Sequence, residues 1–115
     1  MACRSVLGPK VDCYNVDEIW LSEDALVSQG AFLCSASHDY NDPDFPLVTA
    51  PIRLKRSSWV CAEAFIGPGI TVQEGAVVAA RAVVTRNAEA MTVVAGNPAR
   101  PVGRRDEIAI SEIAK

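Results

Sequence analysis

Aliphatic side chains recur at every sixth position in the second half of the chain. The series runs through Leu54, Val60, Ile66, Val72, Val78 and Val84. Four residues after each member stands a second series of mostly small side chains: Ser58, Ala64, Ile70, Ala76, Ala82 and Ala88. An amphipathic helix repeats every 3.6 residues and a half-buried strand every 2, so neither explains a period of six.

A triangular coil built from three short strands explains this period, with one aliphatic residue per side pointing toward the axis. Residues eighteen apart then stack directly, which places Leu54 on Val72, Val60 on Val78 and Ile66 on Val84. Each coil buries its apolar side chains only against its neighbours, as in other solenoids. The sequence therefore predicts an all-β fold, a parallel β-helix.

The same phase is present earlier in the chain, with two interruptions. Its members there are Leu7, Leu21, Val27 and Leu33. The fourteen residues from Leu7 to Leu21 are interpreted as two repeats plus a two-residue insertion near Asp17. The twenty-one residues from Leu33 to Leu54 are interpreted as eighteen plus three.

The second interruption, from about His38 to Pro51, is rich in Pro and Asp and cannot continue a regular ladder. We expect an extruded loop over 38–51, and a long loop on a regular scaffold is usually functional. Turns that require positive φ are expected at glycine and asparagine positions: Gly67, Gly69, Gly75 and Asn87.

The repeat ends after Val94, so we assign residues 1–103 to one β-helix domain. Residues 104–115 are predicted to form a short polar C-terminal helix, with Ile108 and Ile113 available to dock.

Composition narrows the class of protein. The chain has 115 residues, 50% of them hydrophobic, and a net charge of −3, so nothing indicates disorder or a nucleic-acid partner. No run reaches the length of a membrane span and no signal peptide is visible at the N-terminus, so we expect a cytoplasmic protein. The four cysteines form no CxxC pair, so they favour small side chains in a reducing compartment over a zinc or redox site.

Four runs of the sequence carry a resemblance to known proteins: SHDYNDPDFPL, WVCAEAFIGPGITV, AARAVVTRN and VVAGNPAR. From about Val6 to Arg104 the chain resembles the hexapeptide-repeat acetyltransferases, above all the colanic-acid-type enzymes of polysaccharide biosynthesis. Galactoside and maltose acetyltransferases are more distant. The resemblance implies a left-handed helix, a homotrimer, and acetyl-CoA as co-substrate in the groove between neighbouring helices, with no metal. The period alone shows neither the handedness nor the trimer.

His38 is the candidate catalytic residue. It is the only histidine of the chain, and it stands at the start of the extruded loop, where the resemblance places the catalytic base. Neutral imidazole is suited to taking the proton of an acceptor hydroxyl near pH 7. Asp39 either orients the imidazole or shapes the turn.

The resemblance also assigns residues to the acetyl-CoA site. It places the backbone N–H that binds the thioester oxygen at Ala62 and the pantetheine contact at Ala80. Thr85 and Arg86 are expected near the nucleotide. Arg100 is a further candidate for a CoA phosphate, although either arginine is equally explained as a solvated charge. Trp59 either flanks the thioester or packs at a subunit interface.

The acceptor, a small molecule or a saccharide, is expected to contact the N-terminal coils and the loop. Asn15 lies where relatives hold a polar acceptor contact. Tyr14 and Tyr40 are candidates for stacking on a sugar ring, with packing as the alternative.

Two departures from the family pattern concern the scaffold. Relatives commonly have glycines where this chain has Lys55 and Ser57, so the turn before Trp59 is expected to be strained. The resemblance also implies further N-terminal coils in relatives, so the chain is either truncated or capped by self-association.

The sequence bears on two alternative functions. A γ-class carbonic anhydrase has a similar helix but needs three zinc-binding histidines, and this chain has one. The other alternative is a non-catalytic remnant that keeps the solenoid without turnover.

Overall fold

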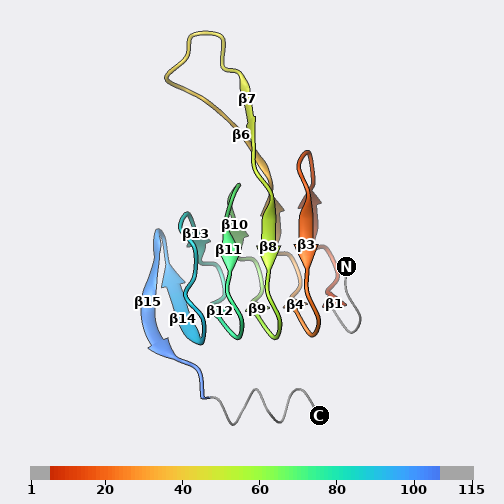
Figure 1. Cartoon of the computed structure of the whole chain (residues 1–115), viewed down its shortest axis with the longest axis vertical. Helices are drawn as coiled ribbons and strands as arrows, with labels where there is room; N and C mark the ends of the chain where they lie inside the picture. The colour runs from red at the N-terminus through yellow and green to blue at the C-terminus, as the bar shows by residue number, and fades with distance from the viewer. Residues whose placement is uncertain (1–5, 107–115) are drawn as a thin grey trace.

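The computed structural model describes residues 6–106, in which every regular element is a strand. The chain forms the expected left-handed parallel β-helix, with short strands stacked on three sides and one hairpin projecting from it (Figure 1). Side A contains β1 (Val6–Leu7), β4 (Leu26–Val27), β9 (Trp59–Val60), β12 (Val77–Val78), β14 (Thr92–Gly96) and β15 (Ala99–Arg104). Side B contains β2 (Asp12–Tyr14), β5 (Phe32–Cys34), β10 (Phe65–Ile66) and β13 (Val83–Val84). Side C contains β3 (Ile19–Leu21), β8 (Ile52–Leu54) and β11 (Thr71–Val72), and the hairpin is β6 (Ala36–His38) and β7 (Leu47–Thr49).

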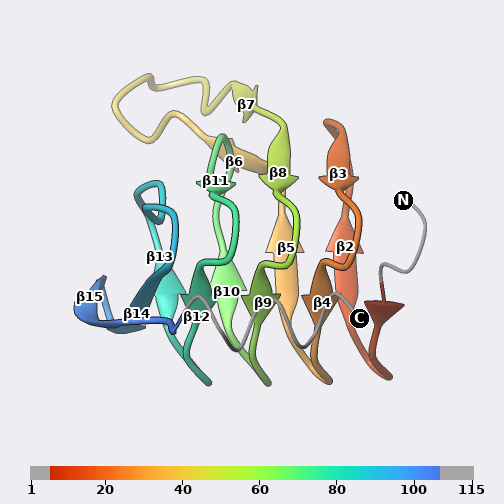
Figure 2. The ribbon, with the colours of Figure 1, turned by 60° about the horizontal axis from the view of Figure 1, so that its bottom comes forward.

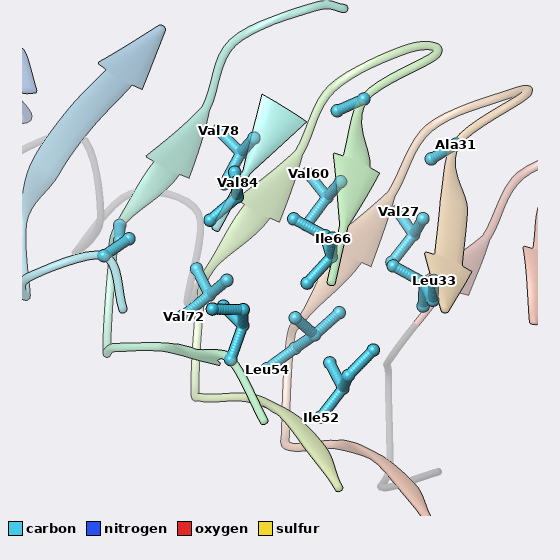
Figure 3. Packing of buried hydrophobic residues seen from close by; sticks show 14 of the residues in the cluster. Val27, Ala31, Leu33, Ile52, Leu54, Val60, Ile66, Val72, Val78 and Val84 are labelled. Atoms are coloured by element: carbon cyan, nitrogen blue, oxygen red, sulfur yellow. The ribbon is translucent and has the colours of Figure 1, made fainter. Parts of the chain in front are cut away.

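The core consists of the period-six aliphatic residues, stacked as the spacing predicts. The register pairs Leu54 with Val72 on side C, Val60 with Val78 on side A and Ile66 with Val84 on side B. All six side chains are buried, and they follow one another along the axis (Figure 3). Burying an aliphatic side chain of this size contributes about 1.5–3 kcal/mol, so the column of core residues dominates the stability of the coils.

The hairpin is a longer insertion than the spacing suggested. Leu21 pairs with Leu54 and Leu33 with Ile66, each thirty-three residues apart instead of eighteen. The excursion therefore adds fifteen residues to one coil, and the interpretation of Leu33 to Leu54 as eighteen plus three is wrong. Leu33 and Leu54 occupy adjacent sides of the same coil.

The small insertion near Asp17 is confirmed. Leu7 pairs with Val27 and Cys13 with Leu33, each twenty residues apart, so the two additional residues lie between β2 and β3.

The parallel ladder ends in an antiparallel pair. β14 pairs in parallel with β12, like the strands before it, and β15 turns back and pairs with β14 in the antiparallel direction. Arg104 is the last residue of strand β15, so the prediction that a helix begins at this residue is wrong. The remainder of the predicted helix, with Ile108 and Ile113, lies outside the described residues.

Positive φ angles occur at fixed corner positions instead of at the expected residue types. Gly69 and Gly75 have positive φ as predicted, whereas Gly67 and Asn87 do not. The corner series also includes Ser57, Glu63 and Arg81, with φ of 57°, 59° and 61°. Ser57 therefore stands in the strained conformation expected for this turn, since the left-handed region is costly for a residue with a Cβ.

Candidate active site

The projecting hairpin carries His38 at the far end of its stem. β6 and β7 pair in antiparallel register, with His38 opposite Leu47. Residues 39–46 close the loop through backbone hydrogen bonds, and the Asp39 N–H donates to the Pro46 carbonyl at 3.1 Å. The His38 side chain is exposed, so the hairpin presents its imidazole on a short two-stranded support.

The imidazole is oriented by the backbone of its own loop. His38 Nδ1 lies 2.8 Å from the carbonyl oxygen of Phe45. A carbonyl oxygen only accepts hydrogen bonds, so the ring nitrogen that makes this bond carries the proton. In the neutral ring the lone pair then resides on Nε2, which is the form that a general base requires.

Asp39 shapes the turn, which is one of the two roles that the sequence left open. Its Oδ1 accepts the backbone N–H of Asn41 at 3.0 Å, the pattern of an Asx turn. Phe45, whose carbonyl orients the imidazole ring, was not identified as a site residue from the sequence. No residue type marks such a position, because every residue offers a backbone carbonyl.

The acceptor candidates lie around the hairpin. Tyr14 ends β2 with 48% of its surface exposed, and Asn15 follows it in an exposed position. Both adjoin the neck of the hairpin, since the Ser35 N–H and hydroxyl donate to the Tyr14 carbonyl at 3.1 and 2.8 Å. Tyr40 is 81% exposed on the loop beyond His38.

Ala62 and Ala80 stack at the corner between sides A and B. The Arg81 N–H donates to the Ala62 carbonyl at 3.0 Å, which joins the two turns. Among residues 6–106, no hydrogen-bond acceptor pairs with the N–H of Ala62 or of Ala80. A free, fixed N–H is the donor that a developing oxyanion requires, so the geometry is compatible with the role expected of Ala62.

Two neighbours of Ala62 define this part of the surface. Trp59 begins β9 and is 40% exposed, and its Nε1–H donates to Ser28 Oγ at 2.9 Å, which fixes the indole on side A. Burial raises the pKa of the Cys61 thiol. Cys61 therefore stays protonated at neutral pH and is a poor nucleophile.

The structure brings the two candidate arginines together. Near the C-terminal coil, a cavity of about 220 Å³ is lined by Arg86, Asn87, Glu89, Val94, Ala99, Arg100 and Pro101. Thr85, exposed directly after β13, immediately precedes Arg86. Two arginines on the lining of one cavity are suited to a phosphate, and the negative charge of Glu89, on the same lining, limits the net positive charge there.

A single chain does not bring all candidate groups together. The hairpin of His38 leaves β5 at the corner between sides B and C, whereas Ala62 and Ala80 lie at the corner between sides A and B (Figure 2). The strands of side B separate these two corners.

No group of three or more His, Cys, Asp or Glu residues between 6 and 106 is arranged to hold a metal ion. Over the same residues, no helix is long and apolar enough to cross a membrane.

Comparison with known proteins gives both a sequence relative and fold relatives. The protein of Escherichia coli (strain K12) assigned as the colanic acid biosynthesis acetyltransferase WcaF is 34% identical over 101 residues, which are 88% of this chain and 56% of WcaF. The N-acyltransferase AntD of Bacillus cereus, solved with dTDP and 3-hydroxybutyryl-CoA, has a TM-score of 0.86 and 18% identity over 94% of this chain and 63% of AntD. A hexapeptide-repeat acetyltransferase of Vibrio cholerae, solved with acetyl coenzyme A, has a TM-score of 0.73 and 19% identity over 93% of this chain and 71% of its own. No protein-family model matches the chain.

These findings define the class of protein that the chain resembles. Its sequence is similar to that of WcaF, as its motifs indicated, and the chain spans about half of the length of WcaF. Its fold is shared with the hexapeptide-repeat acetyltransferase of Vibrio cholerae and with AntD. The structural likenesses, at under 25% identity, show the fold alone.

Proposed function

We propose that the protein is an acetyl-CoA-dependent O-acetyltransferase that acetylates a hydroxyl of a sugar or polysaccharide precursor, with His38 as general base. The observation that carries the proposal is the hydrogen bond between His38 Nδ1 and the Phe45 carbonyl at 2.8 Å, which leaves Nε2 as the basic nitrogen. The relationship to WcaF, whose name describes an acetyltransferase of colanic acid biosynthesis, supports a saccharide acceptor.

The reaction follows from these groups. Nε2 of His38 removes the proton of the acceptor hydroxyl while its oxygen attacks the thioester carbonyl. The negative charge that develops on the thioester oxygen is held by the N–H of Ala62. When the tetrahedral intermediate collapses, the bond to sulfur breaks, and the leaving thiolate takes the proton from the imidazolium.

The remaining candidates are assigned to binding. Ala80 presents a second free N–H one coil beyond Ala62, suited to an amide oxygen of pantetheine, and Trp59 covers the thioester side. Thr85, Arg86 and Arg100 are assigned to the nucleotide end, where the two arginines line one cavity.

On the acceptor side we assign Tyr14, Asn15 and Tyr40. Tyr14 and Asn15 support this role by their position at the hairpin neck, and Tyr40 by its exposure on the loop that carries the base.

The active form is proposed to be a homotrimer in which neighbouring chains complete each site. The separation of His38 from Ala62 on one chain supports this assembly. The hairpin also exposes large apolar side chains that an interface with a second copy would cover: Tyr40, Phe45, Leu47 and Val48, at 81%, 58%, 50% and 47% exposure.

Calorimetric titration with acetyl-CoA, followed by a transfer assay with methyl hexosides as acceptors, tests the proposal. We expect micromolar binding by an oligomer and acetylation of at least one hexoside. Binding without transfer to any hydroxyl, or no binding by a folded protein, would favour the non-catalytic remnant.

Subunit mixing tests the shared site. Homo-oligomers of His38→Ala and of Ala62→Pro are each expected to lose activity by at least about 10²-fold. If sites lie between chains, mixed oligomers contain some interfaces with both native groups and recover part of the activity. No recovery on mixing would place both groups on one chain.

A further inference from the structure

Ser35 connects two parts of the candidate site, the segment from Tyr14 to Asp17 and the hairpin that carries His38. It lies between β5 and β6, at the neck of the hairpin, and it is fully buried. Its carbonyl accepts the Ala50 N–H at 3.0 Å, which closes the neck. His38 is three residues further along the stem.

The Ser35 hydroxyl bonds the backbone of the neighbouring coil. Oγ accepts the Asp17 N–H at 2.9 Å and donates to the Tyr14 carbonyl at 2.8 Å, with the Asp17 carbonyl at 3.2 Å as an alternative acceptor. These groups belong to the segment that contains the two-residue insertion between β2 and β3. An insertion interrupts the ladder and leaves backbone groups without strand partners, and one serine side chain pairs them here.

The same bonds join the proposed acceptor segment to the catalytic hairpin. Tyr14 and Asn15 lie within the segment that Ser35 holds, and His38 lies on the stem that begins beside it. We propose that Ser35 is a positioning residue, whose hydroxyl keeps the Tyr14–Asp17 segment and the His38 hairpin in one relative geometry. This inference rests on the proposed function of both parts.

Ser58 offers a matched control. It is also a corner serine, 1% exposed, but its hydroxyl has no hydrogen-bond partner within the described structure. Ser35→Ala and Ser58→Ala thus remove the same atom from equally buried sites, and only the first removes hydrogen bonds.

The test compares kinetic constants for these variants and for Ser35→Cys, which keeps a weaker donor in nearly the same volume. With the methyl hexoside that the wild type acetylates, we expect Ser35→Ala to raise the acceptor KM about tenfold, the size of losing one or two hydrogen bonds. The Kd for acetyl-CoA stays within about twofold, Ser35→Cys is intermediate and Ser58→Ala is unchanged. An unchanged acceptor KM, or a parallel loss of acetyl-CoA affinity, would overturn the inference.

Amide hydrogen exchange tests the coupling between the two parts and does not require enzyme turnover. The inference can therefore be tested separately from the proposed enzyme activity. In Ser35→Ala we expect faster exchange at Asp17 and also at Ala50 and Asp39 of the hairpin, but not at Gln73 in a later coil. Faster exchange at Asp17 alone, with the hairpin amides unchanged, would show that the two parts are independent and would refute the coupling.

Discussion

The coils and the hairpin bury their side chains in opposite ways. Every period-six aliphatic residue from Leu54 to Val84 is at most 2% exposed, whereas the side chains of β7 are all exposed. The coils are held by packing along the axis, and the hairpin by backbone hydrogen bonds at its neck and loop. The difference shows that the residues that stabilise the fold are not the residues proposed to act on substrates, since the latter contribute little to the core.

The largest expected effect is on turnover and comes from the hairpin. His38→Ala removes the proposed base and should lower acetyl transfer by about 10²–10⁴-fold. The free energy of unfolding should not change, because this side chain is exposed. Steady-state rates and urea unfolding measure the two quantities, and normal turnover would remove His38 from the mechanism.

The second prediction asks whether a coil also contributes to the chemistry. Ala62→Pro deletes the N–H proposed to bind the oxyanion and should lower transfer by about 10²-fold. The fold should tolerate it, because Glu63 follows with a φ of 59° and Pro9 already precedes Lys10, whose φ is 58°. Proline is well suited to the position before a residue of positive φ in a turn.

Ala80→Pro is the control for this variant, since Arg81 repeats the turn with a φ of 61°. We expect a weaker affinity for acetyl-CoA but a nearly normal rate at saturation. Equal loss of rate in both variants would indicate a general effect of proline on the corner instead of loss of the oxyanion donor.

The third prediction compares one substitution in the two regions. Val60→Thr places an unpaired hydroxyl in the core at constant shape and should lower the free energy of unfolding by about 1–3 kcal/mol. Val48→Thr, at 47% exposure on the hairpin, should change it by less than about 0.5 kcal/mol. Chemical denaturation measures both, and similar costs would show that the hairpin is part of the cooperative core.

The smallest effect is a gain in stability. Ser58→Ala removes a buried hydroxyl that has no hydrogen-bond partner among residues 6–106 and should raise the free energy of unfolding by about 1 kcal/mol. A loss of stability in the same denaturation experiment would indicate an ordered water at this corner.

The sequence predicted the coils well because their packing is local and periodic. Each stacked pair from Leu54 onward follows from a spacing of eighteen. The length of the hairpin was misread, because twenty-one residues fit either one coil plus three or one side plus fifteen. Only the pairing of Leu21 with Leu54 distinguishes them.

Properties that depend on contacts between several backbone segments could not be predicted from the sequence. Positive φ was expected at Gly67 and Asn87, but stacking against neighbouring coils imposes it on Glu63 and Arg81. His38 was identifiable as the only histidine on an irregular segment. The Phe45 carbonyl and the Ser35 hydroxyl were not, because their roles arise from contacts that no spacing encodes.

The ends of the fifteen-residue excursion meet at the Ala50–Ser35 hydrogen bond, and β8 continues the coil as though nothing had been inserted. This geometry therefore allows the hairpin to be replaced by another loop without changing the coils. Doubling the length of such a loop costs only about 0.6 kcal/mol in closure entropy. A scaffold of this kind allows the acceptor half of an enzyme to diversify by loop replacement while its coils, and whatever they bind, remain the same.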